Sequence, residues 1–256
     1  MSMRMCRPKP IRRLLPFVGL PFLVAMHAAT LADEPAKPSW NYSPNLLRQF
    51  WQGDTVEGES VLFIKDSKTD EARASVLFPV WQVLAVRNSA ADITYEEGRD
   101  YVWKPESREI VLPAGSRIVS RTPQELRRPA NSQKYQLTHR DGNGEIFFGA
   151  RLEYADMQTC IIYTHAPNLW MSAVPQFDEN ALPRTVHKLL NRQPLTIVLL
   201  GDSISAGANA SALGEAAPFQ PPYPELLRRN LESRYTAKVD FKNLSVGGTD
   251  TNWGLT

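Results

Sequence analysis

The chain has 256 residues, of which 43% are hydrophobic and 22% are charged, and its formal net charge is +2. This composition is typical of a globular protein and excludes a disordered or collagen-like chain. Residues 33–256 hold 24 basic and 27 acidic residues, a net charge of −3, because five of the 29 basic residues and none of the 27 acidic ones precede residue 33. Without a basic surplus we expect no nucleic-acid partner.

Residues 1–32 have the features of a secretory signal peptide. Five basic residues precede the apolar run 14–26, and Thr30-Leu31-Ala32 offers a small-x-small cleavage site. The apolar run is shorter than the roughly 20 residues that span a bilayer, and two prolines interrupt it. We therefore expect residues 1–32 to be removed and the rest to be secreted or periplasmic, without stable membrane insertion.

Cysteine usage predicts no disulfide within the processed chain. Cys6 lies in the expected signal peptide, so Cys160 alone remains after cleavage. Its neighbours, Thr159 and Ile161 to Tyr163, indicate a buried strand. Cys160 is therefore expected to be a small core residue and not a nucleophile.

After an N-terminal segment, 33–57, residues 58–166 predict a β-sandwich-like domain. Short apolar runs alternate there with turn residues, as in all-β domains. Two turns, at 105–107 and 141–144, are expected to join neighbouring strands as hairpins. The expected strands are 60–64, 74–86, 100–103, 109–112, 145–152 and 160–164.

Residues 167–193 are expected to be a linker with a short helix that begins at Pro183. In residues 194–256 the hydrophobic pattern changes to a strand at 195–200, an amphipathic helix at 223–235 and a second strand at 237–242. This order predicts one βαβ unit, the beginning of a doubly wound parallel sheet.

Candidate functional residues follow both of these strands. The first strand ends in Gly201-Asp202-Ser203, and the second is followed by Asn243-x-Ser-x-x-Gly248. Open α/β sheets bind their ligands at the carboxyl ends of parallel strands. A serine hydroxyl there is a candidate nucleophile, and a nearby glycine lets the backbone approach a reacting group closely.

Other interpretations of Gly201-Asp202-Ser203 are less consistent with the sequence. The turn could be a plain strand-to-helix connection with Ser203 as a helix N-cap, but the second block would then be a coincidence. A phosphate-binding loop would need a following Gly-Lys-Ser/Thr, and a dinucleotide site would need Gly-x-Gly-x-x-Gly. Asp202 could instead form an aspartyl phosphate, although the adjacent hydroxyl favours Ser203. We expect no metal site and no cofactor.

The two blocks together resemble the SGNH (GDSL-type) hydrolase superfamily, over about residues 194–256. The resemblance implies a flavodoxin-like, three-layer α/β/α domain, of which this segment would supply the first βαβ unit. It also implies that Ser203 is the nucleophile and that the N–H groups of Ser203 and Gly248 form an oxyanion hole. Asp202 and Asn243 are expected to support the site. The chain also resembles a secreted bacterial subset of this superfamily that carries an N-terminal β-domain.

The family's remaining catalytic groups lie in Gly-x-Asn-Asp and Asp-x-x-His blocks, and neither block occurs in the 256 residues. We therefore expect a truncated secreted serine esterase that is inactive alone and whose family acts on an acyl ester of a small molecule or carbohydrate. The alternative is a non-catalytic secreted carbohydrate-binding or interaction protein, in which Trp81, Tyr101 and Trp103 stack on sugars. No histidine is expected to substitute for the missing base; the four are His27, His139, His165 and His187.

Overall fold

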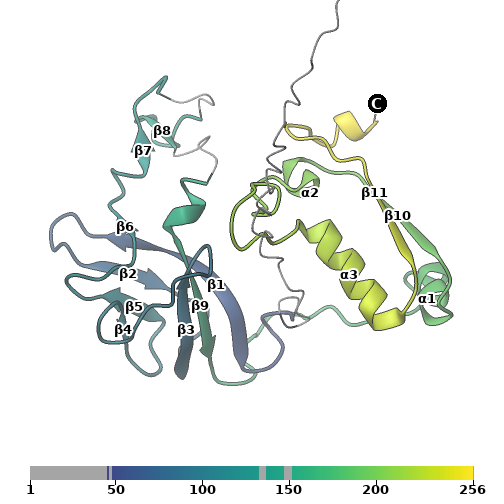
Figure 1. Ribbon diagram of the computed structural model, residues 1–256, viewed down its shortest axis with the longest axis horizontal. Helices are drawn as coiled ribbons and strands as arrows, with labels where there is room; N and C mark the ends of the chain where they lie inside the picture. Colours follow the sequence, from purple (N-terminus) through teal and green to yellow (C-terminus); the bar gives the residue numbers. More distant parts are fainter. Residues whose placement is uncertain (1–44, 46–47, 133–136, 147–151, 256) are drawn as a thin grey trace, which may run out of the picture. The chain divides into compact units, whose positions relative to one another are not determined.

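The computed structural model describes residues 45, 48–132, 137–146 and 152–255 (Figure 1). The chain divides into two units, residues 1–37 and 38–256, and all described residues belong to the second. The expected signal peptide, residues 1–32, lies outside the described residues, so its prediction stays untested.

The described chain is rich in β-structure, and a curled, mostly antiparallel seven-stranded sheet dominates its first part (Figure 1). The strand order is β3-β9-β1-β2-β5-β4, and β6 pairs in parallel with β1. The strands are β1 (Thr55–Lys65), β2 (Ala72–Ser75), β3 (Gln82–Asn88), β4 (Val102–Trp103), β5 (Glu109–Leu112), β6 (Ser120–Arg121) and β9 (Gln158–Thr164), the last preceded by the 3₁₀ helix η2 (Ala155–Met157).

Strand β1 bends because it contains a bulge at Gly58. The register against β9 shifts between Glu57 and Glu59, and Gly58 has φ of +137°, which disfavours other residues. A Cβ atom at Gly58 would also lie only 3.0 Å from Sγ of Cys160 on β9. The bulge lets one strand pair with β9 along its first part and with β2 and β6 near its end.

The concave interior of this sheet is a hydrophobic core. Phe63, Ile110, Ile161 and Tyr163 are fully buried at its centre. Each such side chain contributes about 1.5–3 kcal/mol through burial, so this core stabilises the sheet without a disulfide. Cys160 is a free thiol on β9. It is only partly buried and lies outside the core cluster, which differs from the expected core position, although partial burial still raises the pKa of its thiol.

Two strand predictions need correction. The run expected as one strand, 74–86, forms parts of two strands, β2 and β3, which pair with different partners. Between them the chain bends at Leu77 and Phe78, and the N–H of Val80 donates to the carbonyl of Ser107. Of the strand expected at 145–152, residues 145–146 form β8 (Glu145–Ile146), paired with β7 (Arg127–Arg128), and Leu152 lies in a turn, whereas residues 147–151 lie outside the described residues. The described strands do not include a second sheet packed on the first, so the sandwich remains a prediction.

The C-terminal part contains a parallel pair of strands, β10 (Leu195–Leu199) and β11 (Val239–Asn243), in the register Leu195↔Val239. Helix α3 (Tyr223–Tyr235) connects them and packs along β11 (Figure 1). The other helices are α1 (Pro183–Leu190), α2 (Ser203–Ala206) and the 3₁₀ helix η3 (Trp253–Leu255).

One face of the β10–β11 pair is covered and the other is not. Leu195 and Val239 are buried in a small core with Leu189 of α1 and Ala237. On the opposite face, Val198 is 56% exposed. A parallel sheet is normally covered on both faces, so this pair has an unusual amount of exposed apolar surface.

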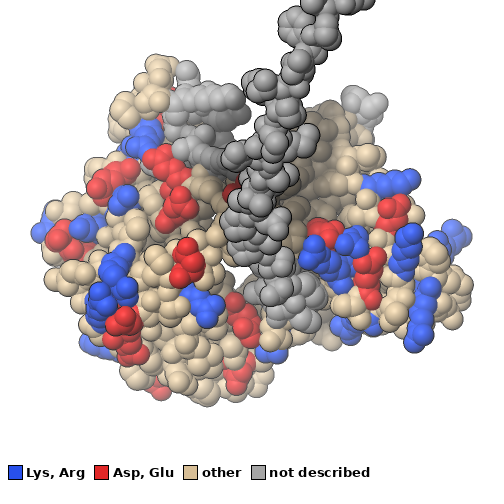
Figure 2. Space-filling model, in the orientation of Figure 1, with Lys and Arg blue, Asp and Glu red and all other residues tan. Residues whose placement is uncertain are grey.

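On the face of the molecule in Figure 2, acidic and basic side chains are interspersed over the described surface. This mixture does not have the single-sign field that would attract a polyanion. Among the described residues, no helix is long and apolar enough to cross a bilayer.

Candidate functional site

Ser203 lies at the beginning of α2, directly after the turn that ends β10. The Asp202 carboxylate caps this helix by accepting a hydrogen bond from the N–H of Ile204 (2.9 Å). Gly201 is required sterically, because a Cβ atom there would lie 2.7 Å from Cβ of Ser205. The three residues therefore have separate local roles. Gly201 leaves room for the Ser205 side chain, and Asp202 caps α2. Ser203 is half-buried at the first position of that helix.

The loop after β11 runs alongside the turn after β10. Backbone pairing continues past the strands: the N–H of Leu244 bonds to the carbonyl of Leu199 (2.8 Å), and that of Val246 to Gly201 (3.0 Å). Gly248 has φ of +80°, a conformation that glycine adopts without strain. This extended pairing brings the two sequence blocks together.

Gly247 is the residue of the second loop that lies beside Ser203. A Cβ atom built on Gly247 would be 3.7 Å from Cβ of Ser203, an ordinary contact distance. The peptide bond after Gly247 carries the N–H of Gly248. Among the described residues, neither this N–H nor that of Ser203 donates a hydrogen bond to a protein group. Within the described part of the chain, the site thus offers two backbone donors that have no protein acceptor, one beside each loop.

Asn243 links the two loops through its side chain. Its Nδ2 donates to the carbonyl of Ser205 in α2 (2.7 Å), and its Oδ1 accepts from the N–H of Ser245 (3.0 Å). Sequence reasoning identified Asn243 as supporting but missed its partner, Ser205. The hydroxyl of Ser205 also lies 2.8 Å from the Tyr223 hydroxyl, at the beginning of α3. Only the fold reveals this pair, because 18 residues separate the two side chains.

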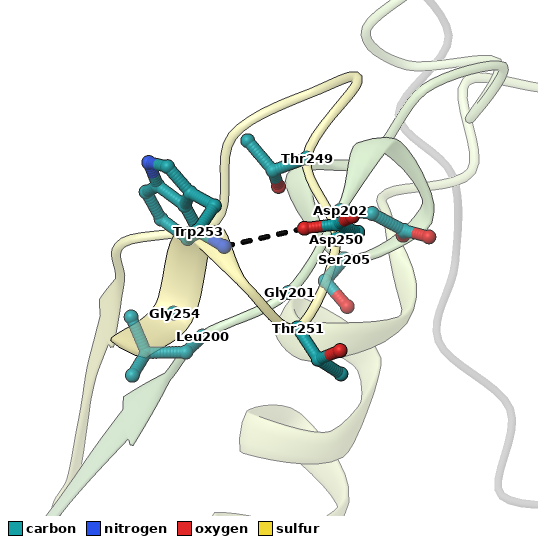
Figure 3. Close-up of a pocket in the computed structure, with 9 residues that line it drawn as sticks. All are labelled: Leu200, Gly201, Asp202, Ser205, Thr249, Asp250, Thr251, Trp253 and Gly254. Carbon is teal, nitrogen blue, oxygen red and sulfur yellow. Dashed lines mark hydrogen bonds between the residues drawn. The ribbon is translucent and has the colours of Figure 1, made fainter. Parts of the chain in front are cut away.

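A large hollow, which we call the strand-edge pocket, lies next to the turn but does not include Ser203 (Figure 3). Its volume is about 810 Å³. Asp250 accepts hydrogen bonds from the N–H groups of Trp253 (3.2 Å) and Asn252 (2.9 Å), which hold its pKa below the usual range. The pocket is lined by Leu200, Gly201, Asp202, Ser205, Thr249, Asp250, Thr251, Trp253 and Gly254.

None of the described histidines is in contact with Ser203. His187 is on α1, which precedes the amino end of β10, whereas Ser203 follows its carboxyl end. His139 lies in a hairpin, with Nδ1 2.8 Å from Asp141 Oδ1. His165 is 2% exposed, and its ring stacks on Phe78. His27 lies outside the described residues.

The aromatic residues considered for sugar stacking differ in exposure. Tyr101 is buried, and Trp103 packs against the core of the curled sheet. Trp81 is 50% exposed. Of the three rings, one is buried, one is partly buried and one is half-exposed.

In the part of the chain that the structure describes, no group of three or more His, Cys, Asp or Glu side chains could hold a metal ion. Comparisons of the chain with family models, with curated proteins and with solved structures found no match.

Proposed function

We propose that this chain carries the nucleophile and part of the oxyanion hole of a secreted serine esterase of the SGNH type, with Ser203 as nucleophile. The observation that carries the proposal is a pair of N–H donors, from Ser203 and Gly248, that have no acceptor among the residues the structure describes and that lie on two loops meeting beside the serine. Preorganised donors of this kind stabilise the negative charge that develops in acyl transfer.

In the proposed reaction, Oγ of Ser203 attacks the carbonyl carbon of an acyl ester. A base takes the hydroxyl proton as the oxygen–carbon bond forms, because a neutral serine is a weak nucleophile. The carbonyl oxygen becomes an oxyanion, held by the N–H groups of Ser203 and Gly248. The intermediate then collapses, the alcohol leaves with a proton, and water later releases the acid from the acyl-serine.

The resemblance implies a base in an Asp-x-x-His block, and this block does not occur in the 256 residues. In the proposal the base belongs to such a block, as does the carboxylate that orients it. A small-molecule or carbohydrate ester is the proposed substrate class, and no metal or cofactor takes part in the steps proposed for Ser203.

A boronic acid tests the nucleophile and the two donors without needing the base. Phenylboronic acid accepts a serine oxygen to form a tetrahedral adduct, in which the oxygen–boron bond forms and the hydroxyl proton passes to the buffer. We expect saturable binding with a tetrahedral ¹¹B resonance, lost in Ser203→Ala. The matched control is Ser233→Ala, an exposed serine on α3. A tetrahedral adduct that persists in Ser203→Ala would contradict the proposal.

A further inference from the structure

We infer that Asn243 is the positioning residue that fixes the distance between Ser203 and the donor loop at Gly247 and Gly248. This inference rests on the proposed function, because the distance matters to chemistry only if Ser203 reacts. Asn243 does not touch the reacting atoms in this account. It acts through the two backbone groups that its amide binds.

The amide of Asn243 makes a different bond in each direction. Its Nδ2 donor binds the carbonyl of Ser205, near the end of α2, where helical carbonyls lack partners within the helix. Its Oδ1 acceptor binds the N–H of Ser245 two residues ahead, which bends the loop after β11. One planar group therefore connects the helix that begins with Ser203 to the loop that contains Gly248.

The position of Asn243 explains why it can make this connection. It is the last residue of β11 and pairs with Leu199, the last residue of β10. A side chain at the end of one parallel strand can reach the segment that follows its neighbour. Although Asn243 is exposed, its two bonds are directed to backbone atoms, so they fix chain positions and not only side-chain rotamers.

The position of Ser203 relative to the donors matters because the rate of a catalysed reaction depends strongly on small displacements of the reacting groups. A misplacement of about 1 Å between reacting groups costs roughly 10²-fold in rate. Alongside the backbone pairing of Leu244 with Leu199 and of Val246 with Gly201, the Asn243–Ser205 hydrogen bond joins the two loops through a side chain. Its loss frees α2 to shift relative to the donors.

Two substitutions separate the two bonds of Asn243. Asn243→Ala removes both of them. Asn243→Asp keeps an acceptor for the Ser245 N–H but places a carboxylate oxygen opposite the Ser205 carbonyl, which repels it. Lys242→Ala, a change to an exposed residue on the other face of β11, is the matched control.

The test measures boronate affinity and amide hydrogen exchange in the 256-residue chain. We expect the dissociation constant for phenylboronic acid to rise about tenfold or more in both Asn243 variants and to stay unchanged in Lys242→Ala. The Ser245 amide should exchange faster in Asn243→Ala but stay protected in Asn243→Asp. If Asn243 only shaped the loop through its bond to the Ser245 N–H, Asn243→Asp would bind phenylboronic acid as tightly as the unaltered chain.

Separate results overturn the inference and the proposed function. If the unaltered chain forms a Ser203-dependent adduct and Asn243→Asp binds equally tightly, the positioning role is wrong and the proposed function stands. If the adduct in the unaltered chain does not depend on Ser203, the proposed function fails, and this inference fails with it.

Discussion

Gly247 and Gly248 are adjacent but face different constraints, and this difference gives a prediction. Gly248 has φ of +80° with open space around its Cα, whereas a Cβ at Gly247 would make only ordinary contacts. Gly248→Ala should strain the loop by about 1–2 kcal/mol and weaken boronate binding about tenfold. Gly247→Ala should change the dissociation constant for phenylboronic acid by less than about threefold. Titration of both variants with phenylboronic acid checks this, and equal losses would contradict the assigned donor.

A second prediction concerns the buried carboxylate of Asp100 in the curled sheet. Arg117 donates to both of its oxygens (2.9 and 2.5 Å), which holds the pKa of Asp100 well below its usual range. A carboxylate with a lowered pKa stabilises the fold fully above the unfolded value of about 3.9, and this contribution is lost as the pH falls. Asp100→Asn should lower the melting temperature most at pH 7.

The difference between Asp100→Asn and the unaltered chain should therefore narrow as the pH falls below about 4. Thermal unfolding followed by circular dichroism over this pH range measures it. Asp240→Asn, an exposed aspartate on β11, is the control and should have no comparable effect. A difference that stays constant with pH would show that the Asp100–Arg117 pair does not contribute in the way described.

At the scale of secondary structure, the sequence predicts elements well where one local signal dominates. Helix α3 has the predicted bounds, 223–235, because prolines at its first positions and its amphipathic pattern agree. The largely apolar run 74–86 predicts one strand. Which of its residues pair with β5 and which with β9 depends on partners far along the chain.

The segment between β9 and α1 is predicted to be the first site of proteolysis. Residues 171–182 contain no helix or strand, and Phe177 is 77% exposed. A protease needs an exposed, extended backbone, so brief chymotrypsin treatment should cut first after Phe177. Mass spectrometry of the earliest fragments tests this, with the fully buried Phe63 as the internal comparison. First cuts within residues 74–112 would contradict the expected β-domain.

The candidate site could be predicted only in part. The sequence indicates Ser203 and Gly248 through the two blocks, because their residue types and order are visible along the chain. It does not reveal that Gly247 lies beside Ser203, nor that Asn243 reaches Ser205, since both contacts depend on the register of β10 against β11. The strand-edge pocket is likewise a product of the fold.

For the whole molecule, the uncovered face of the β10–β11 pair predicts self-association. Val198 and Leu244 on this face are each 56% exposed, and exposed apolar strand surface promotes contact between chains. Sedimentation of a dilution series should show concentration-dependent oligomers. Val198→Lys with Leu244→Lys should raise the monomer fraction, whereas Leu84→Lys, at a half-exposed position on β3, should not. A strictly monomeric unaltered chain would contradict this account of the face.

The central claim is that Ser203 occupies a nucleophile site for which none of the described histidines serves as the base. A fluorophosphonate reports this directly: the Ser203 oxygen–phosphorus bond forms, fluoride leaves, and a base must take the proton. The decisive measurement is the rate of Ser203 labelling, by peptide mass spectrometry, over a range of imidazole concentrations. We predict negligible labelling without imidazole and a rate that rises with its concentration, with none in Ser203→Ala. Rapid labelling of Ser203 without imidazole would contradict the account, because it would require a base among His139, His165 and His187.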